Sequence, residues 1–253
     1  MAISASSLIH YTSSVDSLLG ILKDGFKVTY CRESIYLNGH NYVMYIPMVS
    51  FCDIPLSQVK DHIKKYGNYG IGLTRDWATK SGLNPVLYID SKASLGRCLD
   101  IAYDAFVHEQ DGNIDDLSRP NRCFYDTFRY IKNYQADLIR KTETHRQYRF
   151  YDEREWRYVP PIDADCLMVM GEDIYNGLDK KELMLREKAM DKIASQKLKF
   201  DMEHISYLII NDDNEVNDLI SFIREHKGDS VVFNDLNKLY TKILTVNQIF
   251  SDL

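Results

Sequence analysis

The order of apolar and polar positions predicts a chain that mixes helices and strands. Residues 8–11 are typical of a short strand, and the hydroxyls of Thr12-Ser13-Ser14 are suited to cap a helix. The following apolar residues recur at i, i+3, i+4 and i+7, at Val15, Leu18, Leu19 and Leu22. Gly25 would end this helix, so the chain is predicted to open as strand, cap and helix.

Further elements follow from the same patterns. They are an extended stretch at 42–52, a basic amphipathic helix at 56–65, short strands at 71–73 and 86–89 with a helical turn around Trp77, helices at 95–107 and 181–199, a strand at 205–210, a helix over 216–223 and a strand or short helix within 241–250. The acidic, turn-rich stretch 109–120 predicts a loop insertion. We expect one domain over 1–253, with a linker at 109–120 as the alternative.

Composition narrows the class of protein. The 253 residues are 45% hydrophobic, enough for a substantial core, and the net charge of -6 gives no general attraction to nucleic acid or an anionic membrane. Five scattered cysteines, at 31, 52, 98, 123 and 166, show no metal-ligand spacing. The start lacks an export signal and no long apolar run occurs. We therefore expect a cytoplasmic protein without a metal site or membrane contact.

The run from Tyr151 to Val159 holds two carboxylates two residues apart in a segment rich in aromatic residues. On a strand, Glu153, Glu155 and Arg157 would share one face, because side chains alternate with period two. Such carboxylates suit a transition state that gains positive charge, as when a leaving group departs from a sugar carbon. The alternative is an exposed strand whose charges form weak surface ion pairs.

Two aromatic segments could bind a flat ligand. His10-Tyr11-Thr12 stands where the first strand turns into a helix, so His10 could bond a ribose hydroxyl or a carboxamide and Tyr11 could stack on a ring. Tyr66 and Tyr69 lie in a glycine-hinged loop that could clamp a heterocycle. In both segments, ordinary packing residues are the alternative.

A basic and aromatic stretch runs from Arg140 to Arg157. Its members include Arg149, Arg154 and Arg157, and such a mixture can hold a pyrophosphate or a single-stranded nucleic acid. A solvated charged face is the alternative, since acidic residues dilute the patch. No glycine-rich phosphate loop is present, which argues against a P-loop hydrolase and a doubly wound dehydrogenase.

Four stretches together resemble the bacterial abortive-infection family AbiGi, which is described as an antitoxin. They are His10-Tyr11-Thr12-Ser13-Ser14, residues 47–57 around Val49-Ser50-Phe51-Cys52, residues 66–73 and residues 151–160 with Glu153-Arg154-Glu155-Trp156-Arg157. Their order also resembles, more loosely, the ADP-ribosyltransferase superfamily. That resemblance implies an α+β fold with a split, mostly antiparallel β core, flanking helices and an NAD cleft.

The same resemblance implies roles for individual residues. His10 would contact a ribose of NAD, Tyr66 or Tyr69 would stack on nicotinamide, and Ser50 matches a serine on the middle strand of one branch. Tyr11, Thr12 and Phe51 complete the expected cofactor-binding set. Glu155 would stabilise the oxocarbenium and Glu153 would orient the acceptor. The chain mixes features of two branches, because its initial histidine accompanies a serine strand and a Glu-x-Glu pair.

Three functions are consistent with these patterns. The leading hypothesis is an NAD-dependent mono-ADP-ribosyltransferase of antiphage defence that is restrained by a partner antitoxin. Its expected acceptor is a nucleic acid, an RNA or DNA base, with a protein acceptor as the alternative. The second is a catalytically silent antitoxin or sensor that binds a partner toxin or nucleic acid. The third is an NAD glycohydrolase, in which water takes the place of the acceptor.

Overall fold

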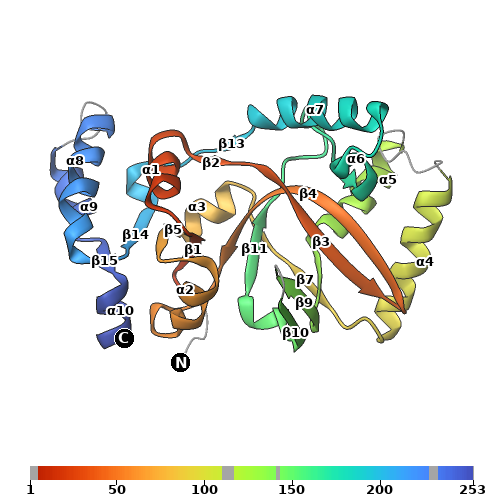
Figure 1. Cartoon of the computed structure of the whole chain (residues 1–253), viewed down its shortest axis with the longest axis horizontal. Helices are drawn as coiled ribbons and strands as arrows, with labels where there is room; N and C mark the ends of the chain where they lie inside the picture. Colours follow the sequence, from red (N-terminus) through yellow and green to blue (C-terminus); the bar gives the residue numbers. More distant parts are fainter. Residues whose placement is uncertain (1–4, 110–116, 141–142, 228–232, 253) are drawn as a thin grey trace. The chain divides into compact units, whose positions relative to one another are not determined.

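A computed structural model describes residues 5–109, 117–140, 143–227 and 233–252, and the chain divides into two units (Figure 1). The first unit combines residues 1–27, 50–83 and 197–253, and the second combines 28–49 and 84–196. The expectation of a single domain stays a prediction. The predicted loop insertion at 109–120 falls largely outside the described residues, and its last two residues begin a helix.

The first unit is built on a sheet of mostly antiparallel strands. Strand β1 (Ser7–Thr12) pairs with β5 (Tyr69–Thr74), and β5 pairs with β14 (Ile205–Ile210), both antiparallel. β14 pairs in parallel with β15 (Ile243–Thr245), and Ile9 of β1 faces Cys52 at the end of β4 (His40–Cys52). A short antiparallel pair joins β2 (Phe26–Lys27) to β13 (Lys197–Leu198).

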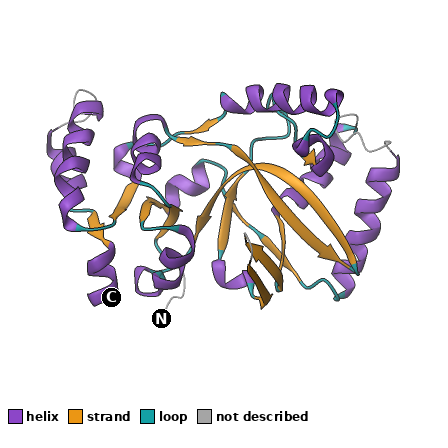
Figure 2. Cartoon of the chain, viewed as in Figure 1, coloured by secondary structure: helices purple, strands orange, loops and turns teal. Residues whose placement is uncertain are grey.

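Helices flank this sheet (Figure 2). They are α1 (Val15–Asp24), α2 (Lys60–Tyr66), α3 (Arg75–Lys80), α8 (Val216–Lys227), α9 (Phe233–Tyr240) and α10 (Val246–Asp252), with 3₁₀ turns η1 (Leu56–Gln58), η5 (Met202–His204) and η6 (Asp213–Glu215). As predicted, the hydroxyl of Ser14 accepts a hydrogen bond from Ser17 N at the start of α1, and Gly25 ends that helix with φ of 83°. Ile9, Ile63, Ile209 and Ile249 share one buried cluster.

The second unit centres on a long hairpin of β3 (Thr29–Leu37) and β4, which run antiparallel from Thr29↔Met48 to Leu37↔His40. Asn38 and Gly39, both with positive φ, form its two-residue turn, as the twist of a hairpin favours. The other strands are β6 (Asn84–Pro85), β7 (Leu87–Ile89), β8 (Ile131–Asn133), β9 (Ala136–Arg140), β10 (Glu143–Tyr148), β11 (Glu155–Tyr158) and β12 (Met170–Gly171). β11 lies between β4 and β6 in the sheet, β12 pairs with β4, β7 runs parallel to β8, and β9 pairs with β10.

The helical elements of the second unit are α4 (Ser94–Glu109), α5 (Arg119–Tyr125), α6 (Glu172–Asn176) and α7 (Lys180–Ala194), with 3₁₀ turns η3 (Asp126–Tyr130) and η4 (Phe150–Glu153). Its core joins the buried side of the hairpin, including Ile35, Met44 and Ile46, to Tyr125 and Phe128. This core supports one face of the strands that position the site described below.

Most predicted elements are confirmed, and one boundary is wrong. The helix predicted over 181–199 ends at Ala194, because residues 197–198 form the strand β13. The mixed composition and the mostly antiparallel pairing agree with an α+β fold, and the transferase-like architecture stays a prediction. Within the described residues, every helix is too short or too polar to cross a bilayer.

Gly67 lies in the loop between Tyr66 and Tyr69, at a position with no room for a side chain. Its φ is +123°, and a Cβ there would overlap backbone atoms of Thr12 and Ser13. We expect Gly67→Ala to lower the free energy of unfolding by about 2 to 3 kcal/mol, combining overpacking with backbone strain. Gly39→Ala is the matched control, because Gly39 has φ of +94° but open space around it. Urea denaturation would measure the free energy of unfolding of both variants. Equal losses would show that the backbone around residue 67 moves enough to remove the overlap with Thr12 and Ser13.

Candidate functional site

The motif around Glu155 folds as a turn followed by a strand. Phe150–Glu153 form the 3₁₀ turn η4, Arg154 is left-handed with φ of 44°, and β11 begins at Glu155. The predicted strand face shared by Glu153, Glu155 and Arg157 is therefore wrong in part. Glu155 and Arg157 do share the buried side of β11, but the left-handed Arg154 interrupts the alternation between Glu153 and Glu155.

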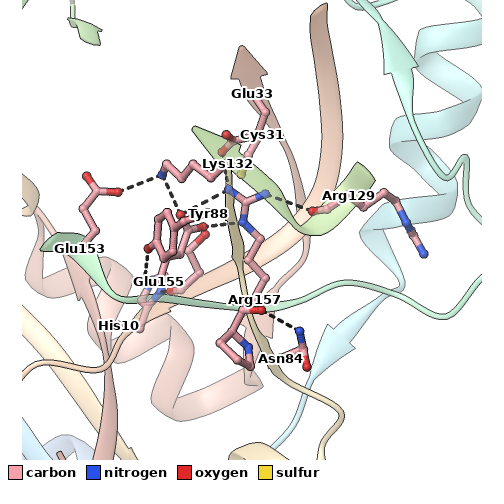
Figure 3. Close-up of polar contacts among 12 residues, drawn as sticks. His10, Cys31, Glu33, Asn84, Tyr88, Arg129, Lys132, Glu153, Glu155 and Arg157 are labelled. Carbon is pink, nitrogen blue, oxygen red and sulfur yellow. Dashed lines mark hydrogen bonds and ion pairs between the residues drawn. The ribbon is translucent and has the colours of Figure 1, made fainter. Parts of the chain in front are cut away.

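Arg157 holds the centre of a buried ion cluster (Figure 3). Its Nε lies 2.6 Å from Glu155 Oε1 and its Nη2 lies 3.3 Å from Glu155 Oε2. Nη2 also lies 2.9 Å from Glu33 Oε1 on β3, and Nη1 donates to the carbonyl of Arg129 at 3.0 Å. The guanidinium is thus surrounded by acceptors, as a fully buried arginine requires.

Lys132 on β8 joins both glutamates of the motif. Its Nζ lies 2.7 Å from Glu155 Oε2 and 2.9 Å from Glu153 Oε2, and it stands 5.0 Å from the centre of the Phe150 ring. Glu153 therefore reaches the cluster from η4 although it is not on the strand. We use the name Glu155 cluster for Glu33, Lys132, Glu153, Glu155 and Arg157.

Tyrosines fix the glutamates of the Glu155 cluster. The backbone N of Glu155 donates to the hydroxyl oxygen of Tyr88 at 2.8 Å, and the hydroxyl of Tyr148 donates to Glu153 Oε1 at 3.1 Å. Burial raises the pKa of the Tyr88 hydroxyl further above neutral pH, so the group that accepts from the Glu155 N–H is the neutral phenol. Strands β7, β10 and β11 and the turn η4 therefore meet at the two carboxylates.

The charges of the cluster stabilise one another. Burial alone would raise the pKa of the Glu155 carboxyl, but the charges of Arg157 and Lys132 outweigh it and hold this pKa well below its usual value. Burial opposes the charge of Lys132 as well, yet Glu155, Glu33 and Glu153 raise its pKa above the usual value. Glu155 is thus ionised at neutral pH, with its charge already neutralised by two cations.

The burial of this cluster excludes the exposed strand with weak surface ion pairs. Arg157 is 0% exposed, Glu153 5% and Glu155 6%. Ion pairs do form, but in the interior, where an unpaired charge would be far more costly than at the surface. Three carboxylates share two cations, so the cluster carries one net negative charge.

The three arginines predicted to bind substrate lie in different surroundings. Arg157 is buried in the Glu155 cluster, and Arg149 is exposed and pairs with Asp152 at 3.6 Å. Arg154 is half-buried beside them in the left-handed position. The structure thus does not present the three as one open basic surface, and their role toward a substrate stays a prediction.

The predicted cofactor-binding residues of the first unit gather around β1. His10 Nδ1 bonds the carbonyl oxygen of Ser50 at 2.8 Å, and its ring packs against Phe51 and Phe26 at centroid distances of 5.7 Å and 5.2 Å. Burial lowers the pKa of His10, so the ring is neutral at pH 7. The structure brings His10, Ser50 and Phe51 together, and it gives His10 a packing role in an aromatic cluster.

The two loop tyrosines contact different partners. Tyr66 ends α2 and its ring lies against His62, at 5.6 Å between centroids. Tyr69 begins β5 opposite Thr12 of β1 and donates its hydroxyl to Glu215 Oε1 at 2.6 Å. That hydrogen bond raises the pKa of Tyr69 to about 12. Tyr11 places its hydroxyl in the interior without a hydrogen-bond partner among the described residues.

Binding and cleavage of NAD would require specific contacts from Glu155 and His10. Glu155 would have to stabilise a developing cation, and its charge is already taken up by Arg157 and Lys132. His10 would have to face a ribose with its second ring nitrogen, Nε2, because its Nδ1 bonds the carbonyl oxygen of Ser50. NAD binding stays a prediction, and Glu155 as arranged here belongs to a closed ion cluster. Among the described residues, no group of His, Cys, Asp and Glu could hold a metal ion.

Comparison with known proteins identifies the family. A family model described as "Putative abortive phage resistance protein AbiGi, antitoxin" matches residues 24–211. The chain belongs to the AbiGi family. All five residues of the Glu155 cluster lie inside the matched region, whereas His10, Tyr11 and Thr12 lie outside it.

A relative supports the same assignment over most of the chain. The abortive phage resistance protein AbiGi of Lactococcus lactis subsp. cremoris is 28% identical over 225 residues, which cover 82% of this chain and 89% of that protein. The AbiGi-family chain described here is therefore an abortive-infection, phage resistance protein. No solved structure matches it.

Sequence reasoning missed Lys132 and Glu33 of the Glu155 cluster, and it missed Tyr88, which bonds the backbone of Glu155. Lys132, Glu33 and Tyr88 come from β8, β3 and β7, far from the Glu153-Glu155 motif in the chain. No local signal marked Lys132, because it alternates with the buried Ile131 and Asn133, and this alternation is typical of a strand residue that faces solvent.

Proposed function

We propose that this chain is the antitoxin of an abortive-infection system and neutralises a partner toxin protein without catalysis of its own. The observation that carries the proposal is the closed state of Glu155, whose two oxygens are both bonded by buried cations. A carboxylate in this state stabilises a fold rather than a developing positive charge. The description of the AbiGi family as an antitoxin supports the same function.

A growth assay tests the proposal. Bacteria that express the chain alone should grow like the empty-vector control, and co-expression should relieve the toxicity of the toxin encoded beside it in its natural host. Growth arrest by the chain alone, relieved by Glu155→Gln, would overturn the antitoxin function. Failure to relieve the neighbouring toxin would also count against it.

The second candidate is NAD-dependent ADP-ribosyl transfer to a nucleic acid or protein. It is favoured by the meeting of Glu153 and Glu155 at a single ammonium group, since paired carboxylates are what the transferase resemblance implies. Purified chain would be incubated with labelled NAD and, separately, with RNA, DNA and protein. We expect no labelled product and no released nicotinamide.

Two other results of that incubation would support catalysis instead. Label on an acceptor from the wild-type chain, but not from Glu155→Gln, would establish a transferase. Release of nicotinamide without labelled acceptor would establish an NAD glycohydrolase. Because Gln is nearly isosteric with Glu, circular dichroism of Glu155→Gln must show an unchanged fold before its inactivity is interpreted.

A further inference from the structure

Helix α4, labelled in Figure 1, carries exposed apolar residues in addition to the face that it buries. Leu99, Ala102 and Tyr103 pack against the core of the second unit. Leu95 and Ile101 point elsewhere and are 55% and 65% exposed. An isolated exposed leucine needs no explanation, but apolar residues arranged along one helix face indicate an interaction surface.

The exposed apolar residues form a continuous line. They are Leu95, Cys98, Ile101 and Ala105, all exposed, and we call them the α4 stripe. Their spacing of three, three and four residues keeps them on one side of a helix. This is the spacing by which a helix packs against another helix.

Charges beside the α4 stripe indicate what covers it. Arg97 and Asp104 are seven residues apart and therefore lie on the same flank of the stripe. In an antiparallel pair of identical helices related by a two-fold axis, equal flanks meet. Arg97 of one copy would then face Asp104 of the other, twice in the same interface. The flank is thus complementary in charge to itself.

The same two-fold axis also places large apolar residues of one copy opposite small ones of the other. Place the two-fold axis midway between Arg97 and Asp104. Along the helix axis, Leu95 of one copy then lies about 1.5 Å, one residue rise, from Ala105 of the second copy. Cys98 comes within about two residue rises of Ile101 in the second copy. Large side chains therefore alternate with small ones along the seam, as close helix packing requires.

We propose that a second copy of this chain docks on the α4 stripe, forming a two-fold dimer through antiparallel α4 helices. The partner surface is identical, so Arg97 and Asp104 set the register and Leu95 and Ile101 supply the apolar contact. The inference stands on α4 alone and does not depend on the proposed antitoxin function.

Light scattering coupled to size exclusion, at about 1 to 100 μM chain, would measure the mass. We expect twice the mass of one chain, and Ile101→Asp should weaken the dimer by about 100-fold. Leu178→Asp is the matched control, since Leu178 is 72% exposed but lies outside α4. A monomer at every concentration, or a dimer insensitive to Ile101→Asp, would overturn the proposal.

Charge reversal tests the register. Arg97→Asp and Asp104→Arg should each weaken the dimer by about tenfold, and the double variant should recover it. A double variant no better than either single one would overturn the antiparallel register. Because every substituted side chain is exposed, circular dichroism should show a folded chain throughout.

Cys98 provides an independent readout. Helix rise and helix spacing place the two Cys98 Cα atoms about 11 to 13 Å apart in the dimer, too far for a disulfide but within reach of a short bis-maleimide. Cross-linking should be lost in Cys98→Ser and retained in Cys123→Ser, the control for the exposed cysteine of α5. Cross-linking that depends only on Cys123 would contradict the α4 interface.

Discussion

Arg157→Met is expected to lower the free energy of unfolding by about 3 to 5 kcal/mol, among the largest effects of any single substitution in this chain. Arg157 is fully buried, and its guanidinium bonds Glu155, Glu33 and the Arg129 carbonyl. Methionine fills part of the volume but offers no donor. The buried Glu155 and the half-buried Glu33 would then lose the guanidinium that they share, and the cost of burying the Glu155 charge would be only partly compensated.

Urea denaturation followed by circular dichroism measures this loss. Arg149→Met is the matched control, because Arg149 is exposed and only pairs with Asp152 at the surface, so its loss should cost less than about 1 kcal/mol. Similar midpoints for the two variants would show that the Glu155 cluster contributes no more than surface charges do. A Glu33→Gln/Arg157→Met double variant should recover part of the loss, since it removes one stranded charge.

Lys132→Met is expected to cost about 3 kcal/mol at pH 7 and to change the response to acid. Without the ammonium, Glu153 and Glu155 would face each other across a buried site, and close carboxylates favour uptake of a proton. In the wild-type chain, by contrast, the pKa of Glu155 is held below its unfolded value.

Stability should depend on pH with opposite sign at this site in the wild-type chain and in the Lys132→Met variant. A depressed carboxyl pKa contributes stability at pH above the unfolded value of about 4.3, and this contribution is lost as the pH falls through the folded pKa. The wild-type chain should therefore lose stability in acid. In Lys132→Met the folded state binds the extra proton, so its deficit relative to wild type should shrink between about pH 7 and pH 5.

Denaturation midpoints of both chains across this pH range give the comparison. Lys132→Met/Glu153→Gln should recover stability at pH 7, because Glu155 keeps Arg157 while the opposing carboxylate is gone. Lys181→Met, on the exposed side of α7, is the control for removing a lysine. A deficit of Lys132→Met that stays constant with pH would contradict the pairing of the two glutamates.

Local patterns were sufficient for much of the secondary structure. Ser14 and Gly25 bound α1 as predicted, and the apolar run at Ile205–Ile210 is a strand, because caps, glycine stops and runs of β-branched residues act within a few residues. The helix expected to reach residue 199 stops at Ala194, since Lys197 and Leu198 gain strand partners from residues 26–27. That pairing joins segments about 170 residues apart, which no local pattern encodes.

The sequence by itself determined that Glu153, Glu155 and Arg157 are unusual, and its motifs were enough to indicate the AbiGi family. Only the tertiary structure decided what these charges do. Lys132, Glu33 and Tyr88 come from three other strands, and with them a motif that resembles a catalytic pair becomes a buried cluster in which Glu155 is paired with two cations. The physical reason is that the free energy of a buried charge depends on which opposite charges surround it in space, and spacing along the chain does not specify them.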